Sequence, residues 1–283
     1  MLGLGLAACL AAPARAEENP FGYSYTAATE EPGETEVSLW TTDRRGKDAG
    51  HYDAQDYRLE VERGLTGRFQ IAAYLNFVSH HIRGLEPAIA DVHRNFTFDG
   101  ASLEFKYRLL DEQRHGIGLA VYAEPGWSRF HDVEGEKGTE YELELKTIVS
   151  KSFADGHLIW AGNLTFEPEW ERELEVSSGG LPEHHWEKEL KLEATTGLAY
   201  RLAPSWYAGV EARYAGVYPD WTHGLHREAY AVSAGPTIAF KTHEWSASLT
   251  YLPQLVGGPS AGAHRSFDEF EKREIRLKLS HEF

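Results

Sequence analysis

The end of the chain carries a strict alternation that constrains the fold more than any other feature. Within residues 271–283, Ile275, Leu277 and Leu279 share one parity with the terminal Phe283, while the positions between them are mostly charged. A repeat of two is the period of a β-strand, whose successive side chains point to opposite faces. The segment therefore predicts an amphipathic strand with its charged face in water.

The same alternation recurs from Thr35 onward, in runs separated by polar connections. We count twelve runs, and their connections alternate between short and long. The short ones lie near residues 64, 112, 154, 203 and 242, and the long ones span 43–54, 78–98, 126–138, 170–185, 216–226 and 254–270. Unequal ends and an even strand count are typical of membrane barrels, with short periplasmic turns and long extracellular loops. We predict an all-β, transmembrane, antiparallel up-and-down β-barrel of about twelve strands, forming a single domain over residues 35–283.

Two soluble folds also have strands with this alternation. An amphipathic edge strand of a soluble sandwich would explain the closing run, but a sandwich has no reason to keep its two ends so unequal. A lipocalin-like barrel would turn the apolar parity inward. A twelve-stranded barrel is wider than the eight-stranded barrels that side chains can fill, so an apolar interior would leave large voids. The pattern favours an apolar outer face and a wet, charged lumen.

The polar parity supplies the residues that we expect to line this lumen. Acids outnumber bases on most strands, and bases are concentrated on the closing strand. The acidic row at positions 140–144 would attract cations, or it would form a structural ladder opposite basic rows on neighbouring strands. The candidates are Arg58, Glu60, Glu62, Glu104, Lys106, Arg108, Glu140, Glu142, Glu144, Glu189, Lys191, Glu193, Glu211, Arg213, Lys272, Glu274, Arg276 and Lys278.

Aromatic residues on the apolar parity gather near both ends of the runs. Two such belts are what the interfacial girdles of a membrane barrel look like. Pro236 lies inside one run, where the missing N–H removes a ladder hydrogen bond, so we expect an irregularity there. The belt residues are Phe69, Tyr107, Tyr200, Trp206, Phe240, Trp245 and Phe283 at the short turns, and Phe77, Tyr141, Trp186, Tyr214, Tyr230 and Tyr251 at the long loops.

The residues before the first run predict export. Small apolar residues lead to Ala14-Arg15-Ala16, which has the form of a signal-peptidase site. We predict a signal peptide at 1–16 and an irregular lead-in at 17–34. The usual basic n-region is missing, so we expect the true start upstream. Alternatively, Leu6-Ala7-Ala8-Cys9 is a lipobox and Cys9, the only cysteine, carries a lipid.

Composition and motifs exclude several function classes. The net charge of −16 argues against nucleic acid as a partner, because phosphate binding needs clustered bases. No Gly-x-Ser-x-Gly, His-Glu-x-x-His, glycine-rich phosphate loop or cysteine pair is present. Loop histidines such as His80 and His81 have irregular spacing, which favours solvated side chains over metal ligands. We predict no catalytic residue, no metal and no cofactor.

The closing strand resembles that of bacterial outer-membrane β-barrel proteins, whose terminal aromatic residue is read by the assembly machinery. The resemblance implies that Phe283 is an assembly signal. The mature chain resembles a family of uncharacterised bacterial outer-membrane β-barrel proteins, most typically at Leu65-Thr66-Gly67-Arg68-Phe69-Gln70 and Ala73-Tyr74-Leu75-Asn76. This implies location in the outer membrane, with its lipids and the barrel assembly machinery as partners, but it implies no substrate.

Three functions remain open from the sequence. We favour a narrow, porin-like channel or passive transporter for small polar or charged solutes. The first alternative is a barrel sealed by ion pairs that acts as a structural or surface-binding protein through its long loops. The second is a hydrolase on the barrel wall.

Overall fold

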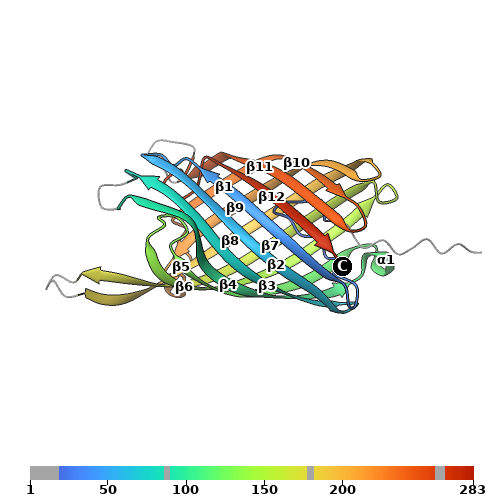
Figure 1. Ribbon diagram of the computed structural model, residues 1–283, viewed down its shortest axis with the longest axis horizontal. Coiled ribbons are helices and arrows are strands. Elements are labelled where there is room, and N and C mark those ends of the chain that lie inside the picture. The colour runs from blue at the N-terminus through green and yellow to red at the C-terminus, as the bar shows by residue number, and fades with distance from the viewer. Residues whose placement is uncertain (1–18, 86–89, 177–181, 259–264) are drawn as a thin grey trace, which may run out of the picture.

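Strand pairing follows the order of the chain and closes on itself (Figure 1). The computed structural model describes residues 19–85, 90–176, 182–258 and 265–283, with only the backbone described at 173–176 and 182–185. All pairs are antiparallel, and β1 meets β12 to complete a twelve-stranded barrel, as predicted. The strands are β1 (Thr35–Arg45), β2 (His51–Thr66), β3 (Phe69–Arg83), β4 (Val92–Leu110), β5 (Gly118–Phe130), β6 (Lys137–Phe153), β7 (Leu158–Val176), β8 (Pro182–Ala203), β9 (Trp206–Pro219), β10 (Ala229–Lys241), β11 (Trp245–Gly258) and β12 (Arg273–Glu282).

The apolar parity of the strands faces outward. Leu39 and Leu103 are 47% and 52% exposed, whereas Glu60 and Glu104 on the other parity are 4% and 2% exposed. Within an expected belt, aromatic rings on neighbouring strands contact each other. The ring centroids of Trp206 and Phe240, for example, lie 5.1 Å apart. An apolar outer face with interfacial aromatic residues is the surface that a bilayer requires of a barrel.

The strands extend beyond the apolar band, so the connections at one end are shorter than the expected spans. The connection from β1 to β2 is residues 46–50 rather than 43–54. Backbone pairing continues through polar residues, because strand pairing needs no apolar face once the strands leave the bilayer. Strands β7 and β8 have 19 and 22 residues and form the hairpin that projects furthest in Figure 1.

The short turn between β4 and β5 contains one helical turn, α1 (Glu112–His115). The side chain of Asp111 accepts the backbone N–H of Arg114, and Gly116 ends the turn with a φ of 72°. A side-chain N-cap and a left-handed glycine are the usual means of satisfying the two ends of a helix. A short 3-10 helix, η1 (Trp221–His223), lies in the connection between β9 and β10.

The irregularity expected at Pro236 is confirmed. The ladder between β10 and β11 is interrupted after Ser233 and resumes at Thr237. A Cβ on Gly235 would lie 1.9 Å from the carbonyl oxygen of Tyr251, so the two strands approach too closely there for any side chain. The proline thus lies where the ladder already lacks a hydrogen bond.

A second interruption separates the outer parts of β4 and β5. Their pairing reaches only to Ala101 and Trp127. Beyond it, the Asp99 carboxylate accepts the backbone N–H groups of Arg129 and Phe130, both at 3.1 Å. On this side, the end of β5 is thereby held by the Asp99 side chain in place of backbone pairing with β4. The connection that follows β5 lies over the barrel mouth.

Among the described residues, no helix has the length and apolarity needed to cross a bilayer. The predicted signal peptide at 1–16, including Cys9, lies outside the described residues.

The outward face predicts a depth-dependent response to charge. Leu164 and Leu202 are 66% and 65% exposed on the same face, but Leu164 lies in the middle of β7 and Leu202 lies at the short-turn end of β8. Arginine at a barrel midplane costs about 2–4 kcal/mol, and near the interface about 0–1 kcal/mol. We expect Leu164→Arg to lower the unfolding free energy in vesicles by the larger amount and Leu202→Arg to leave it nearly unchanged. Equal losses at both sites would contradict this membrane placement.

Candidate functional site: the barrel lumen

An extended N-terminal segment lies inside the barrel. We call residues 19–31 the lumen segment. It has no strand or helix, yet Phe21, Ser24 and Ala27 are buried. No charged residue occurs from Asn19 to Thr29. An uncharged stretch can enter the barrel without bringing in further charges that would need partners.

One carboxylate holds the start of this segment. The two oxygens of Glu211 on β9 accept the backbone N–H groups of Gly22, Tyr23 and Ser24 at 2.8, 2.9 and 2.9 Å. The hydroxyl of Thr250 donates to the same carboxylate at 2.7 Å. Hydrogen bonds to an ionised acceptor are about twice as strong as neutral ones. Glu211 therefore accepts the hydrogen bonds of three amides that have no neighbouring strand to accept them.

Other wall side chains continue the pattern along the segment. The Asn163 amide on β7 binds both backbone groups of Tyr25, since its Oδ1 accepts the N–H at 2.8 Å and its Nδ2 donates to the carbonyl at 2.9 Å. Two further acceptors are Ser150 Oγ for the N–H of Ala27 and Gln70 Oε1 for the N–H of Glu30, both at 3.0 Å. Strands β3, β6, β7 and β9 thus all anchor the segment.

Two tyrosines of the segment contact basic side chains of the wall. The guanidinium of Arg276 lies 4.0 Å from the ring centre of Tyr23, and the ammonium of Lys146 lies 4.2 Å from that of Tyr25. The Tyr23 hydroxyl also donates to Glu274 at 2.9 Å. Cations over aromatic faces are attracted to the ring, so the segment stabilises these two charged side chains in the lumen.

Close packing of the segment requires two glycines. A Cβ on Gly22 would lie 2.6 Å from the hydroxyl of Thr250, and a Cβ on Gly197 of β8 would lie 2.5 Å from the ring of Phe21. A glycine on each side of the contact therefore allows the segment to approach the wall.

The connection between β5 and β6 covers the other end of the lumen. We call residues 131–136 the outer loop. Its Asp132 reaches Arg44 on β1, with 2.9 Å between the charged groups, and the hydroxyl of Tyr52 donates to the Asp132 carbonyl at 3.4 Å. Arg44 also binds Asp56 at 2.9 Å. One buried guanidinium thus links the outer loop to the wall.

Further ion pairs join the connection before β12 to the same place. Glu271 lies 3.4 Å from both Arg44 and Lys47. Burial alone would raise the pKa of the Glu271 carboxyl, but the charges of Lys47 and Arg44 lower it. Three connections therefore meet at the outer mouth.

The outer chamber is the cavity between the lumen segment and the outer loop. It has a volume of about 280 Å³, with Tyr23 and Tyr25 on one side and His131 and Asp132 on the other. Its acids outnumber its Lys and Arg residues by ten to five. The acids are Asp56, Asp99, Glu124, Asp132, Glu140, Glu142, Glu144, Glu167, Glu169 and Glu193, and the bases are Arg58, Lys146, Lys191, Arg213 and Arg276.

Glutamates face each other directly across strands in this chamber. Glu142 of β6 is opposite Glu169 of β7, and Glu144 of β6 is opposite Glu124 of β5. Like charges directly opposite are destabilising in a sheet. Lys191 pairs with Glu169 at 2.8 Å and Lys146 pairs with Glu144, which offsets part of the repulsion.

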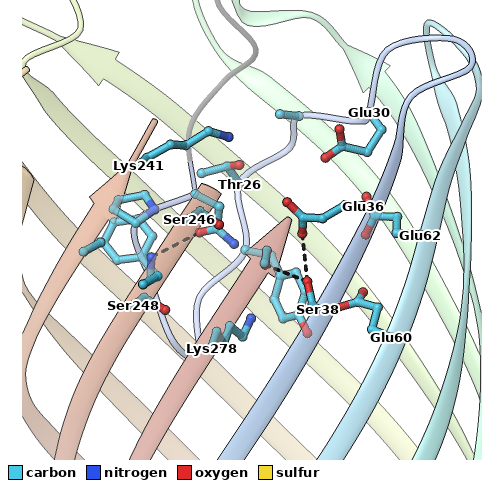
Figure 2. Close-up of a pocket in the computed structure, with 18 of the residues that line it drawn as sticks. Thr26, Glu30, Glu36, Ser38, Glu60, Glu62, Lys241, Ser246, Ser248 and Lys278 are labelled. Carbon is cyan, nitrogen blue, oxygen red and sulfur yellow. Dashed lines mark hydrogen bonds between the residues drawn. The ribbon is translucent and has the colours of Figure 1, made fainter. Parts of the chain in front are cut away.

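The inner chamber lies at the short-turn end and has a volume of about 110 Å³. Figure 2 shows Glu36, Glu60 and Glu62 gathered on one side of it and Lys241 on the other. Tyr25 lines both chambers, so the lumen segment separates them.

The structure distributes the eighteen expected lumen residues over several places. The outer chamber is lined by Arg58, Glu140, Glu142, Glu144, Lys191, Glu193, Arg213 and Arg276, and the inner chamber by Glu60, Glu62, Glu104, Lys106 and Lys278. Glu274 lines a third cavity of about 130 Å³ beside the outer chamber, and Glu211 holds the lumen segment. Arg108 binds Asp111 at a short turn, and Glu189 lies opposite Glu169 on β7.

Lys272 does not lie in the lumen. It precedes β12, is exposed, and its ammonium lies 5.3 Å from the ring centre of Phe267. Its backbone N–H donates to the carbonyl of Gly46 at 2.7 Å. Its backbone is still bonded to β11, since its carbonyl accepts the N–H of Gln254 at 3.0 Å, but its side chain lies beyond the start of β12.

Sequence reasoning missed the lumen segment and the side chains that hold it. Asn163, Ser150 and Gln70 are uncharged and carry no signature of a site. The uncharged stretch from Asn19 to Thr29, in a chain with 25% charged residues, was the available signal.

Three acidic groups have the spacing to hold a metal ion, and one of them, Glu30, Glu34 and Glu282, lies at the short-turn end. The carboxylates of Glu60, Glu62 and Glu104 lie within 4.8 Å of one another, and so do those of Glu140, Glu142 and Glu169. Within the described parts of the chain, no group of three such ligands contains a histidine.

The fold is that of bacterial outer-membrane β-barrels. An outer membrane channel of the COG4313 group from Pseudomonas putida F1 aligns with 94% of this chain and 100% of its own, at 14% identity and a TM-score of 0.59. The translocator domain of the autotransporter NalP from Neisseria meningitidis aligns with 89% of this chain and 90% of its own, at 10% identity and a TM-score of 0.52.

The chain belongs to DUF6662, a family of unknown function, which matches residues 13–283. The resemblance to an uncharacterised outer-membrane barrel family is thereby confirmed. A comparison with curated proteins gives no match.

The ion pair between Arg58 and Glu124 provides a test of the lumen wall. Glu124 is 4% exposed and also accepts the hydroxyls of Tyr122 and Ser102. Removing one partner of a buried pair costs about 3–5 kcal/mol. We expect Arg58→Met to lower the unfolding free energy, measured by urea titration in vesicles, by this amount. The double variant Arg58→Met/Glu124→Gln should recover most of the loss, and an equal loss in both variants would contradict the pairing.

Proposed function

We propose that this protein is a narrow outer-membrane channel that passes small cationic or polar solutes through its lumen. The acidic outer chamber carries this proposal. Its glutamates include Glu140, Glu142 and Glu167, for which no basic nitrogen lies within 4.0 Å among the described residues. Charges of one sign on low-dielectric walls concentrate counter-ions.

The opposed glutamates support a role beyond stability. A purely structural lumen wall would gain by placing Lys or Arg opposite Glu142 and Glu144, since opposite charges stabilise a cross-strand pair. Here both face another glutamate. A passing cation would neutralise such pairs transiently. The channel named among the structural neighbours supports the same class of function through its fold alone.

A sealed barrel is the second candidate function. The lumen segment, the outer loop and the Arg44 ion pairs all narrow the path. If they never move, the outer connections are the functional surface and the lumen is a structural core.

We also propose that residues 1–16 direct export, that the protein resides in the outer membrane among its lipids, and that Phe283 is presented to the barrel assembly machinery. Phe283 is 74% exposed, and its backbone N–H donates to the carbonyl of Thr35 at 2.9 Å. The barrel is therefore closed up to its last residue, and the ring stays accessible.

The chamber charge predicts ion preference. We expect Glu140→Gln, Glu142→Gln and Glu167→Gln together to lower the permeability of K⁺ relative to Cl⁻ roughly twofold or more without abolishing conductance, because the fixed negative charge is reduced. Reversal potentials across planar bilayers with a KCl gradient measure this ratio.

A control with the same net charge change uses exposed acids that line none of the chambers, Asp155→Asn, Glu228→Gln and Glu244→Gln. It should keep the ratio of the wild type. Equal effects of the two triple variants would remove the chamber as the source of selectivity.

A further inference from the structure

We infer that the lumen segment is a displaceable gate, latched by Glu211, whose release joins the inner and outer chambers. This inference rests on the proposed channel function and concerns its regulation.

The segment is attached in a way that permits release. Six of its backbone N–H groups, from Gly22 to Glu30, bond to wall side chains. None belongs to a strand ladder. Each chamber offers space on one side of the segment, so water can replace a side-chain acceptor one bond at a time.

The far end of the segment is fixed and provides a pivot. The N–H of Gly33 donates to the carbonyl of Gly64 at 2.9 Å, and the N–H of Gly64 donates to the carbonyl of Glu34 at 3.1 Å. Gly33 has a φ of 96°, a conformation that a side chain disfavours. Residues 19–31 can therefore swing while their link to β1 stays in place.

Glu211 is the contact whose loss frees most of the segment. It accepts three successive N–H groups, and no Lys or Arg nitrogen of the described residues lies within 4.0 Å of it. The amides of the segment therefore stabilise the buried carboxylate of Glu211, and the carboxylate in turn satisfies the three amides.

Tyr25 is the residue of the lumen segment that lines both chambers. Its ring lies 5.9 Å from that of Tyr122 and 6.4 Å from that of Trp40, so it bridges from β5 to β1 across the lumen. Both cavities touch this ring and that of Trp40, so moving Tyr25 removes the part of the partition that the lumen segment supplies.

The latch is tested by Glu211→Ala in single-channel recordings. We expect the wild type to show brief, rare openings. The variant should raise the open probability roughly tenfold or more, because three anchors are lost together, at an unchanged open-channel conductance. An open probability equal to that of the wild type would overturn the latch.

A reversible lock tests the gate without removing any anchor. A Cβ on Gly118 would lie 3.0 Å from the Cβ of Ala27, so a separation of about 0.5 Å more brings two cysteines into the range of a disulfide. In a chain with Cys9→Ser, we expect oxidised Ala27→Cys/Gly118→Cys to be silent and dithiothreitol to restore wild-type openings. Ala27→Cys alone should not respond to either reagent.

The outcomes separate the gate from the channel. If the oxidised double variant conducts like the reduced one, the segment is not a gate, although the channel stands. If wild type, Glu211→Ala and the reduced double variant are all silent, the proposed channel itself fails, and the gate fails with it.

Discussion

The width of a twelve-stranded barrel is the constraint on which this structure depends. Side chains can fill the interior of about eight strands but not that of twelve, and an unfilled apolar interior is unfavourable. This chain fills part of its lumen with its own residues 19–31 and covers the outer mouth with residues 131–136. The remaining space is divided into polar chambers.

A backbone placed inside a barrel needs hydrogen-bond partners, and this need shapes the wall. An unsatisfied buried amide costs about 1–3 kcal/mol. The inward parity therefore carries acceptors such as Glu211, Asn163 and Ser150 where the segment passes. Elsewhere it carries charge. The same parity thus has two roles, anchoring the segment and setting the potential of the chambers.

The period of two was sufficient to predict the strands, their order and their outward face, since each depends on neighbouring residues. The bulge at Pro236 was predictable for the same reason. The lumen segment was not, because Gly22 and Glu211 are 189 residues apart and their contact leaves no periodic mark. Lys272 keeps the parity of the lumen residues but is exposed, because alternation does not show where the side chains of a strand leave the barrel.

Amide hydrogen exchange of the folded chain in lipid tests the central claim most directly. If residues 19–31 are anchored in the lumen, five N–H groups should exchange more slowly than in an unstructured peptide, by a factor on the order of a hundred or more. These are the N–H groups of Gly22, Tyr23, Ser24, Tyr25 and Ala27. Exchange at the rate of a free peptide would contradict the account, because the segment would then lie outside the barrel.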